Sequence, residues 1–365
     1  ANKPYEPHNY TGQEYGPVSL RKALQGSLNI SAVKVLYLAG VKNVLRLAEK
    51  MGYSTLSEDD ADRLGLSLVL GGGEVILLEH TNAFSAFARE GLIHDPVFIL
   101  KIEDNKGKVL YEWEEEPGRR VLEANIARMT NSVLSDNEAR AYVFGNNNYL
   151  TLPDRPVAAK TGTTNNYRDV WTIGYTPSLV TGVWCGNNDN TAMVQGASSS
   201  QIAAPIWHTY MKRVLTGTPV ETFNPPEYDP NVRPILKGEG FAQKIVKIDR
   251  ASGKLATEYT PASYIIEKTY IQDHSLLYYV DKDQPQNYYP KYTEDDPQFD
   301  NWEEGVKKWI AKQQAKDPNF VVEQPPTEYD DLHIPDNLPI FSVNLKNNQL
   351  VTDKYLVMNL EATAP

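Results

Sequence analysis

Residues 157–186, which read VAAKTGTTNNYRDVWTIGYTPSLVTGVWCG, decide the fold. The segments 169–175 and 179–185 are rich in β-branched and aromatic residues, and Pro156 and Gly162 bound the shorter segment 157–162. β-Branched and aromatic residues favour strands, whereas Gly, Pro, Asn and Ser favour the turns between them. The stretch therefore predicts three antiparallel strands joined by short connections.

Helical patterns lie on both sides of this sheet in the sequence. Apolar residues recur at helical spacing. The predicted helices lie at 17–50, 74–90, 122–143 and 200–215. Gly26-Ser27-Leu28-Asn29 interrupts the first of them, because Gly, Ser and Asn favour caps and turns. A hairpin is expected over 96–113. Helices, a sheet and a covering helix together indicate an α+β domain over 1–217.

The last third of the chain follows a different plan. A linker rich in Pro and Gly is expected over 218–240, followed by a small mixed extension over 241–325. Within the extension, segments 244–249 and 254–257 predict a hairpin around the turn Arg250-Ala251-Ser252-Gly253.

The same extension predicts an amphipathic helix with Asp300 as its N-cap. Its apolar face consists of Trp302, Val306, Trp309 and Ile310. Strand-like alternation from Leu338 onward indicates that 326–365 begins a truncated, β-rich module of the β-sandwich type.

Composition excludes several classes of protein. The chain has 36 basic and 47 acidic residues and a net charge of −11, which argues against a nucleic-acid binder and a polybasic membrane-surface module. Its single cysteine, Cys185, excludes an internal disulfide framework and a multi-cysteine zinc site. The six histidines form no i, i+4 pair, so the sequence predicts no metal site. No apolar run approaches the ~18 residues that span a bilayer.

Two short motifs carry the chemistry. Lys160-Thr161-Gly162-Thr163 lies at the end of a predicted strand. A glycine there allows close approach of another backbone, and an edge strand can pair with an extended peptide. The alternative is a solvated lysine beside a turn. Ser27-Leu28-Asn29 lies on the turn between two predicted helices, where its structural alternative is a helix cap.

The surroundings of both motifs resemble the second and third motif regions of bifunctional (class A) penicillin-binding proteins. The resemblance extends over about 4–215. On the N-terminal side it rests on Asn9-Tyr10, on Tyr15-Gly16-Pro17-Val18-Ser19-Leu20-Arg21 and on Ser27-Leu28-Asn29-Ile30. On the C-terminal side it rests on Ala159-Lys160-Thr161-Gly162-Thr163-Thr164-Asn165, on Gly174-Tyr175-Thr176-Pro177 and on Val183-Trp184-Cys185-Gly186.

This resemblance implies the α+β fold of penicillin-binding proteins and serine β-lactamases. It also implies a D,D-transpeptidase that cross-links the D-Ala-D-Ala stem peptides of peptidoglycan by serine acyl transfer and binds β-lactams, without a cofactor. Ser27 would relay a proton to the leaving amine, and Asn29 would bind the penultimate amide of the substrate. Lys160 would supply positive charge for the substrate carboxylate.

The resemblance assigns substrate contacts to the next three residues as well. The hydroxyl groups of Thr161 and Thr163 would bind the carboxylate, and the backbone N–H of Thr163 would be one oxyanion donor. Gly162 would leave room for the peptide. We therefore expect the Ser27 Oγ and Lys160 Nζ atoms to lie within hydrogen-bond range or to be bridged by one water molecule.

The nucleophilic Ser-x-x-Lys of this family has no credible match. Ser19-Leu20-Arg21-Lys22 lies only eight residues before Ser27, about 12 Å along a helix, and Ser31-Ala32-Val33-Lys34 follows the second motif instead of preceding it. We expect the nucleophile to lie before Ala1, together with a membrane anchor and a glycosyltransferase domain. The chain would then be a truncated transpeptidase domain from outside the cytoplasmic membrane, inactive alone.

Two other functions remain open. One is a non-catalytic peptidoglycan-binding or scaffolding module that keeps the transpeptidase shape. The other is a hydrolytic relative, a D,D-carboxypeptidase or β-lactamase. A Ser-x-x-Lys at the start of an apolar helix just upstream would support the enzyme.

Overall fold

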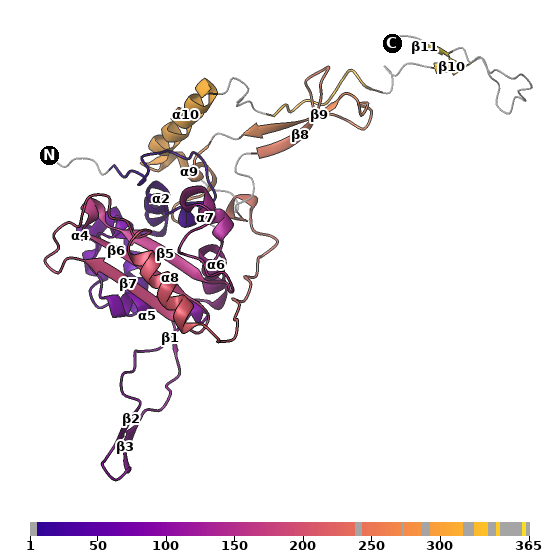
Figure 1. Cartoon of the computed structure of the whole chain (residues 1–365). Helices are drawn as coiled ribbons and strands as arrows, with labels where there is room; N and C mark the ends of the chain where they lie inside the picture. Colours follow the sequence, from indigo (N-terminus) through magenta and orange to yellow (C-terminus); the bar gives the residue numbers. More distant parts are fainter. Residues whose placement is uncertain are drawn as a thin grey trace, which may run out of the picture. The chain divides into compact units, whose positions relative to one another are not determined.

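The computed structural model describes residues 6–237, 243–271, 274–285, 293–316, 325–334, 341–343 and 360–362. The chain divides into two compact units (Figure 1). Unit 1 comprises Ala1–Gly238 and Leu276–Phe299, and unit 2 comprises Glu239–Ser275 and Asp300–Pro365. None of the described helices is long and apolar enough to cross a membrane.

The predicted three-stranded sheet is confirmed in unit 1. Strands β5 (Ala158–Thr163), β6 (Asp169–Tyr175) and β7 (Val180–Gly186) are antiparallel in the order β5-β6-β7. Lys160 lies opposite Ile173, and Gly162 lies opposite Trp171. Strand β5 is therefore an edge strand, with its outer side facing away from β6.

Helices cover both faces of this sheet. Helix α8 (Ala203–Val214) packs so closely that a Cβ atom at Gly174 would meet its Trp207 ring at 2.4 Å. Helix α5 (Leu77–Ala88) packs on the other face, where a Cβ atom at Gly182 would meet Thr81 Oγ1 at 2.1 Å. Because Gly174 and Gly182 are one residue out of register, they face opposite sides, and α5 and α8 enclose the sheet (Figure 1).

Side-chain alternation along β5 follows from this layering. Ala159 belongs to the buried cluster that contains Trp207 of α8. Ala158 belongs to the cluster of Leu134 and Tyr175 on the other face, against which Phe84 of α5 packs. Lys160 shares the face of Ala158, so its side chain points toward the helical layer formed by the first part of the chain.

The helical layer is built from segments before and after α5. Its helices are α1 (Leu20–Gln25), α2 (Asn29–Ala39), α3 (Val41–Lys50), α4 (Ala61–Leu64), α6 (Ala124–Leu134) and α7 (Asn137–Phe144). Short 3-10 helices in the first part of the chain are η1 (Glu58–Asp60), η2 (Gly65–Leu70), η3 (Asn165–Tyr167) and η4 (Pro234–Lys237).

Two of the predicted helices are divided. The range 17–50 forms three helices, and the first break falls at Gly26–Leu28, as the turn-forming residues indicate. The range 122–143 forms α6 and α7 because the Asp136 side chain accepts a hydrogen bond from the Ala139 N–H at 2.8 Å and so starts a new helix.

The expected hairpin is confirmed in a shorter form. Strands β2 (Lys101–Glu103) and β3 (Val109–Glu112) pair antiparallel. Strand β1 (Leu92–Ile93) pairs with β4 (Arg119–Arg120) at the base of this hairpin. The segment that returns to unit 1 contains α9 (Leu276–Tyr279) and the 3-10 turn η5 (Thr293–Asp295).

Unit 2 contains the predicted hairpin together with a longer strand pair. Strand β8 (Gln243–Asp249) pairs with β9 (Ile265–Ile271) along one edge. Along its other edge it forms the bridge Ile248↔Leu255, and the Asp249 and Ala256 N–H groups donate to Lys254 O and Lys247 O, both at 2.9 Å. The predicted turn forms, since the Gly253 N–H donates to Asp249 O at 2.8 Å. The predicted hairpin is therefore confirmed in a short form, and β9 is a second partner of β8 that the sequence analysis did not predict.

The amphipathic helix is confirmed as α10 (Phe299–Lys316), with Trp302 and Ile310 buried. Asp300 lies inside its first turn and is not its cap. Strands β10 (Phe341–Val343) and β11 (Leu360–Ala362) pair antiparallel. The remainder of the expected β-sandwich module lies outside the described residues.

Candidate active site

Ser27 occupies a strained position at the end of α1. The Ser27 N–H donates to Leu24 O at 3.1 Å and the Leu28 N–H donates to Ala23 O at 3.0 Å. These two bonds form a Schellman motif, in which the residue at the position of Ser27 is usually glycine because its φ is positive. Ser27 has φ = 53°. The backbone thus holds a serine in a conformation that costs free energy, as is common at functional sites.

The residue before it is held by close packing. A Cβ atom at Gly26 would lie 2.1 Å from Tyr142 Oη. This hydroxyl donates to Lys22 O at 2.7 Å, so Tyr142 ties α7 to the last turn of α1. The turn that presents Ser27 is therefore held by α1, which precedes it, and by Tyr142 of α7.

Lys160 reaches this turn from the edge strand β5. Its Nζ atom donates to Ser27 Oγ at 2.7 Å and to Thr161 O at 2.8 Å. The contact expected between the two motifs is thus confirmed, although 133 positions separate the two residues in the chain. One N–H of the ammonium group remains for a ligand, since the group has three donors.

The environment of Lys160 changes its acidity. Burial, and secondarily the positive charge of Arg140, lowers the pKa of Lys160 from 10.5 to about 8. At pH 7 the Lys160 amine is still protonated in most molecules, but it loses its proton far more readily than a solvated lysine does. The group can therefore supply positive charge and also exchange a proton with Ser27 near neutral pH.

A buried polar network behind Lys160 connects the helices to β5. Arg140, 1% exposed, donates to Leu134 O at 2.7 Å, to Ala159 O at 3.4 Å and to Gln25 Oε1 at 3.3 Å. Gln25, also 1% exposed, donates through Nε2 to Asp136 O at 2.9 Å. Sequence reasoning missed both residues, because arginine and glutamine usually mark exposed positions.

The backbone of β5 directs hydrogen-bonding groups toward its open edge. The Thr164 N–H donates to Asp169 O at 3.1 Å, so the backbone N–H and C=O groups of even-numbered residues pair with β6. The backbone groups of odd-numbered residues point away from β6, and the Thr161 carbonyl oxygen accordingly accepts a hydrogen bond from Lys160 Nζ. The N–H groups of Thr161 and Thr163 therefore face the edge at which an extended peptide can pair.

The Thr163 side chain is fixed by a neighbouring loop. Its Oγ1 atom accepts a hydrogen bond from the Ser199 N–H at 3.2 Å. The buried Ser199 hydroxyl lies 2.9 Å from Thr172 Oγ1 and so anchors the loop to β6. Because the Thr163 oxygen acts here as an acceptor, its hydroxyl hydrogen can be donated to a ligand. Ser199 carried no signal in the sequence.

Gly162 leaves room beside the strand. A Cβ atom at this position would meet Trp171 Cβ at 3.5 Å, an ordinary van der Waals contact. The fold itself therefore has room for a methyl group at this position, and we infer that any need for glycine comes from what approaches the edge.

Asn29 begins α2, two residues after Ser27. Its Nδ2 group donates to His8 O at 2.8 Å, and Asn9 Oδ1 accepts from the Ile30 N–H at 3.2 Å. The segment before α1 thus contacts the second motif directly. Asn29 uses one of its two side-chain N–H donors in this contact.

The two Ser-x-x-Lys strings of the sequence lie in ordinary helical positions. Ser19 is the N-cap of α1, where its Oγ atom accepts from the Lys22 N–H at 3.3 Å. Ser31 lies within α2. Both strings therefore have a structural explanation in their helices.

Comparisons with known proteins agree with this geometry. The family described as "Penicillin binding protein transpeptidase domain" matches residues 1–212. The chain is 40% identical over 223 residues to penicillin-binding protein 1A of Aquifex aeolicus, covering 60% of this chain and 29% of that protein. It is 33% identical over 232 residues to penicillin-binding protein 2D of Bacillus subtilis, covering 61% and 32%. The chain spans about a third of the length of these relatives.

Solved structures show the same relationship. The penicillin-binding protein PonA1 of Mycobacterium tuberculosis matches with a TM-score of 0.53 and 28% identity, over 61% of this chain and 62% of that one. PonA1 in complex with penicillin V matches with a TM-score of 0.52 and 28% identity, over 60% and 62%. Strand β5, its lysine and the helical turn of Ser27 all fall inside the matched residues, and the chain belongs to the penicillin-binding protein transpeptidase family.

Proposed function

We propose that the chain supplies the substrate-binding half of a serine D,D-transpeptidase site that acts on the D-Ala-D-Ala ends of peptidoglycan stem peptides and binds β-lactams. The observation that carries this proposal is the 2.7 Å hydrogen bond from Lys160 Nζ to Ser27 Oγ beside the open edge of β5. The reaction would take place outside the cytoplasmic membrane, where peptidoglycan lies.

In this proposal the peptide binds as an additional strand along β5. The N–H groups at the edge pair with its backbone, and the Thr161 and Thr163 hydroxyls donate to its terminal carboxylate. Lys160 contributes positive charge close to the same carboxylate. The Asn29 side chain binds the penultimate amide.

The chemistry is acyl transfer. A serine hydroxyl attacks the carbonyl of the penultimate D-Ala, and the Thr163 N–H stabilises the oxyanion. The C–N bond then breaks as a proton passes through the Ser27 hydroxyl to the departing amine of the last D-Ala. Lys160 favours this relay because its nearby charge stabilises negative charge that develops on Ser27 Oγ. An amine from a neighbouring strand takes the acyl group and releases the serine.

The attacking serine is the part that these 365 residues do not provide. Ser19 caps a helix through its Oγ atom, and Ser31 follows Ser27 inside α2. We therefore assign the nucleophile to a Ser-x-x-Lys outside the present sequence, and the chain alone binds substrate without forming an acyl-enzyme.

A binding experiment tests the recognition half. A fluorescent N-acyl-D-Ala-D-Ala peptide is titrated with the purified chain, and the all-L peptide serves as the ligand control. We expect K160A to weaken binding at least ~10-fold through loss of a charge-assisted bond. K106A, which removes an exposed lysine from the β2–β3 turn, should bind as wild type does. Equal affinity of wild type and K160A, or for both peptides, would overturn the proposal.

A further inference from the structure

We propose that Asp249, Asp330 and His333 of unit 2 form a binding site for one divalent transition-metal ion of the Zn²⁺ class. Asp249 is the last residue of β8, and Asp330 and His333 lie in the segment 325–334. One ligand atom from each residue lies within 4.8 Å of the other two. Asp330 and His333 are three residues apart, whereas Asp249 is distant in the sequence and is brought to them by the fold.

Burial of negative charge is the first argument for a cation. Asp249 is 0% exposed and Asp330 is 3% exposed. Two buried carboxylates repel each other strongly unless positive charge lies between them. Within the described part of the chain, the side chain that pairs with them is the His333 imidazole, whose Nδ1 atom forms a 2.7 Å hydrogen bond with Asp330 Oδ2 and lies 3.8 Å from Asp249 Oδ1. Nearby Lys254 pairs with Asp331 and Glu328 instead.

The hydrogen bonds of Asp249 provide a second, independent argument. Its Oδ2 atom accepts from the Ser252 N–H at 2.6 Å and so stabilises the turn after β8. Its Oδ1 atom is buried and accepts no hydrogen bond from any described residue. A buried carboxylate oxygen without a donor is costly. Since this oxygen faces His333 Nδ1, an ion between them would satisfy it.

The type of ligand indicates the class of metal. Tetrahedral ligands at about 2.0–2.1 Å from Zn²⁺ lie about 3.3 Å apart. His333 Nδ1 lies 3.8 Å from Asp249 Oδ1, and its 2.7 Å hydrogen bond to Asp330 Oδ2 would open when the ion enters. One imidazole nitrogen with two carboxylate oxygens suits Zn²⁺ and its neighbours, whereas Mg²⁺ and Ca²⁺ prefer oxygen ligands alone. A water molecule would complete the four-coordinate shell.

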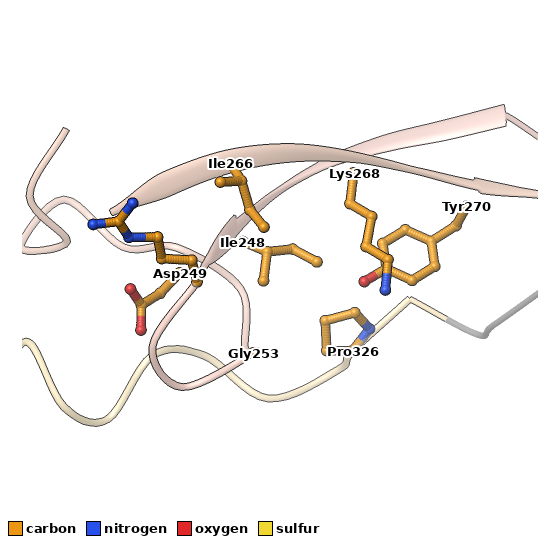
Figure 2. A pocket seen from close by; sticks show the side chains of 8 residues that line it. Ile248, Asp249, Gly253, Ile266, Lys268, Tyr270 and Pro326 are labelled. Atoms are coloured by element: carbon orange, nitrogen blue, oxygen red, sulfur yellow. The ribbon is translucent and has the colours of Figure 1, made fainter. Parts of the chain in front are cut away.

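The surroundings orient the ligands as metal sites require. The Thr260 hydroxyl donates to Asp330 Oδ2 at 2.7 Å, and the Leu332 N–H donates to Asp330 Oδ1 at 3.0 Å. Such supporting bonds fix a carboxylate for coordination. Asp249 also lines one end of a cavity of about 410 Å³, opposite Lys268 and Tyr270 (Figure 2). The ion would join β8 to the segment 325–334 and stabilise unit 2 by closing the long loop between them.

Metal uptake by the full 365-residue chain tests the proposal. The chain is stripped with a chelator, and Zn²⁺ binding is followed by calorimetry and by the shift in unfolding temperature. We expect one Zn²⁺ ion per chain and a raised unfolding temperature. H333Q and D249N should each weaken binding at least ~100-fold, and T260V, which removes a supporting bond, about 10-fold. H8Q, which removes an exposed histidine of unit 1, is the matched control and should bind normally.

X-ray absorption at the zinc edge decides the ligands without relying on a variant that folds. Wild type should show one imidazole together with oxygen ligands at about 2.0–2.1 Å. The proposal is overturned if the stripped chain takes up no Zn²⁺ or if H333Q binds as tightly as wild type. A spectrum without an imidazole ligand would also overturn the proposal. None of these results depends on whether the transpeptidase assignment of unit 1 holds.

Discussion

At the scale of single residues, Ser27 combines a structural cost with a chemical role. It holds φ = 53° at a position where a helix end favours glycine. Replacement by glycine should relieve this strain, whereas replacement by alanine removes the hydroxyl and keeps the strain.

We therefore predict that S27G is more stable than S27A by about 1 kcal/mol. Urea unfolding of both variants measures this difference. The pair S31G and S31A is the control, because Ser31 lies within α2 and glycine there should be less stable than alanine by about 1 kcal/mol. If S27G proved less stable than S27A, Ser27 would not be strained.

Lys160 predicts a pH dependence of stability. Because its pKa falls from 10.5 to about 8 on folding, the unfolded chain binds more protons between these pH values. The stability of wild type relative to K160M should therefore rise between about pH 8 and 10.5, by roughly 1–3 kcal/mol. Chemical unfolding across this range tests the sign. K106M should show no such trend, and a flat difference for K160M would contradict the buried position of the amine.

The contact of Ser27 with Lys160 was predictable because two short motifs resembled a known pair. The residues that hold it in place were not. Arg140 and Gln25 are polar side chains that the fold buries, and their partners are mostly backbone carbonyl oxygens. Nothing in a local sequence pattern distinguishes such a residue from a solvated one.

At the scale of elements, two glycines of the sheet should respond differently to a methyl group. A Cβ atom at Gly174 would meet the Trp207 ring at 2.4 Å, whereas one at Gly162 meets its nearest neighbour at 3.5 Å. We predict that G174A lowers the free energy of unfolding by about 1–3 kcal/mol and that G162A changes it by less than about 1 kcal/mol. Equilibrium unfolding compares them.

G162A also separates the effect of Gly162 on folding from its effect on peptide binding. G162A should weaken binding of N-acyl-D-Ala-D-Ala peptides although its fold is intact, because the added methyl group would obstruct an incoming strand. Unchanged peptide affinity in folded G162A would show that the peptide does not approach β5 at this position.

Strand prediction succeeded where neighbouring segments pair and missed a partner that lies further along the chain. β5, β6 and β7 follow one another, so their turns and composition were sufficient. β8 pairs with 254–257, as local spacing predicted, and also with β9 across an intervening loop. The second pairing was missed because no local pattern links β8 to a strand beyond its own hairpin.

At the scale of the whole molecule, the chain should bind penicillin without reacting. We predict no covalent adduct after incubation with a fluorescent penicillin, measured by gel fluorescence and intact mass, since Ser19 and Ser31, the serines of the two Ser-x-x-Lys strings, lie at the N-cap of α1 and within α2. A serine β-lactamase serves as the positive control. A labelled serine in this chain would show that the nucleophile lies within it.

Long-range assembly limits what the sequence can reveal at this scale. The α+β domain was predictable because its helices and strands have clear periods. The cluster of Asp249, Asp330 and His333 was not, because only the tertiary structure brings Asp249 to the local pair of Asp330 and His333. The sequence accordingly predicted no metal site.

The most direct test of the central claim locates the peptide carboxylate. Amide NMR signals of threonine- and glycine-labelled chain are compared upon addition of N-acyl-D-Ala-D-Ala and of the same peptide with a terminal carboxamide. The account predicts that Thr161, Gly162 and Thr163 shift with the carboxylate peptide and much less with the carboxamide. Equal shifts with both peptides, or shifts confined to residues away from β5, would contradict it.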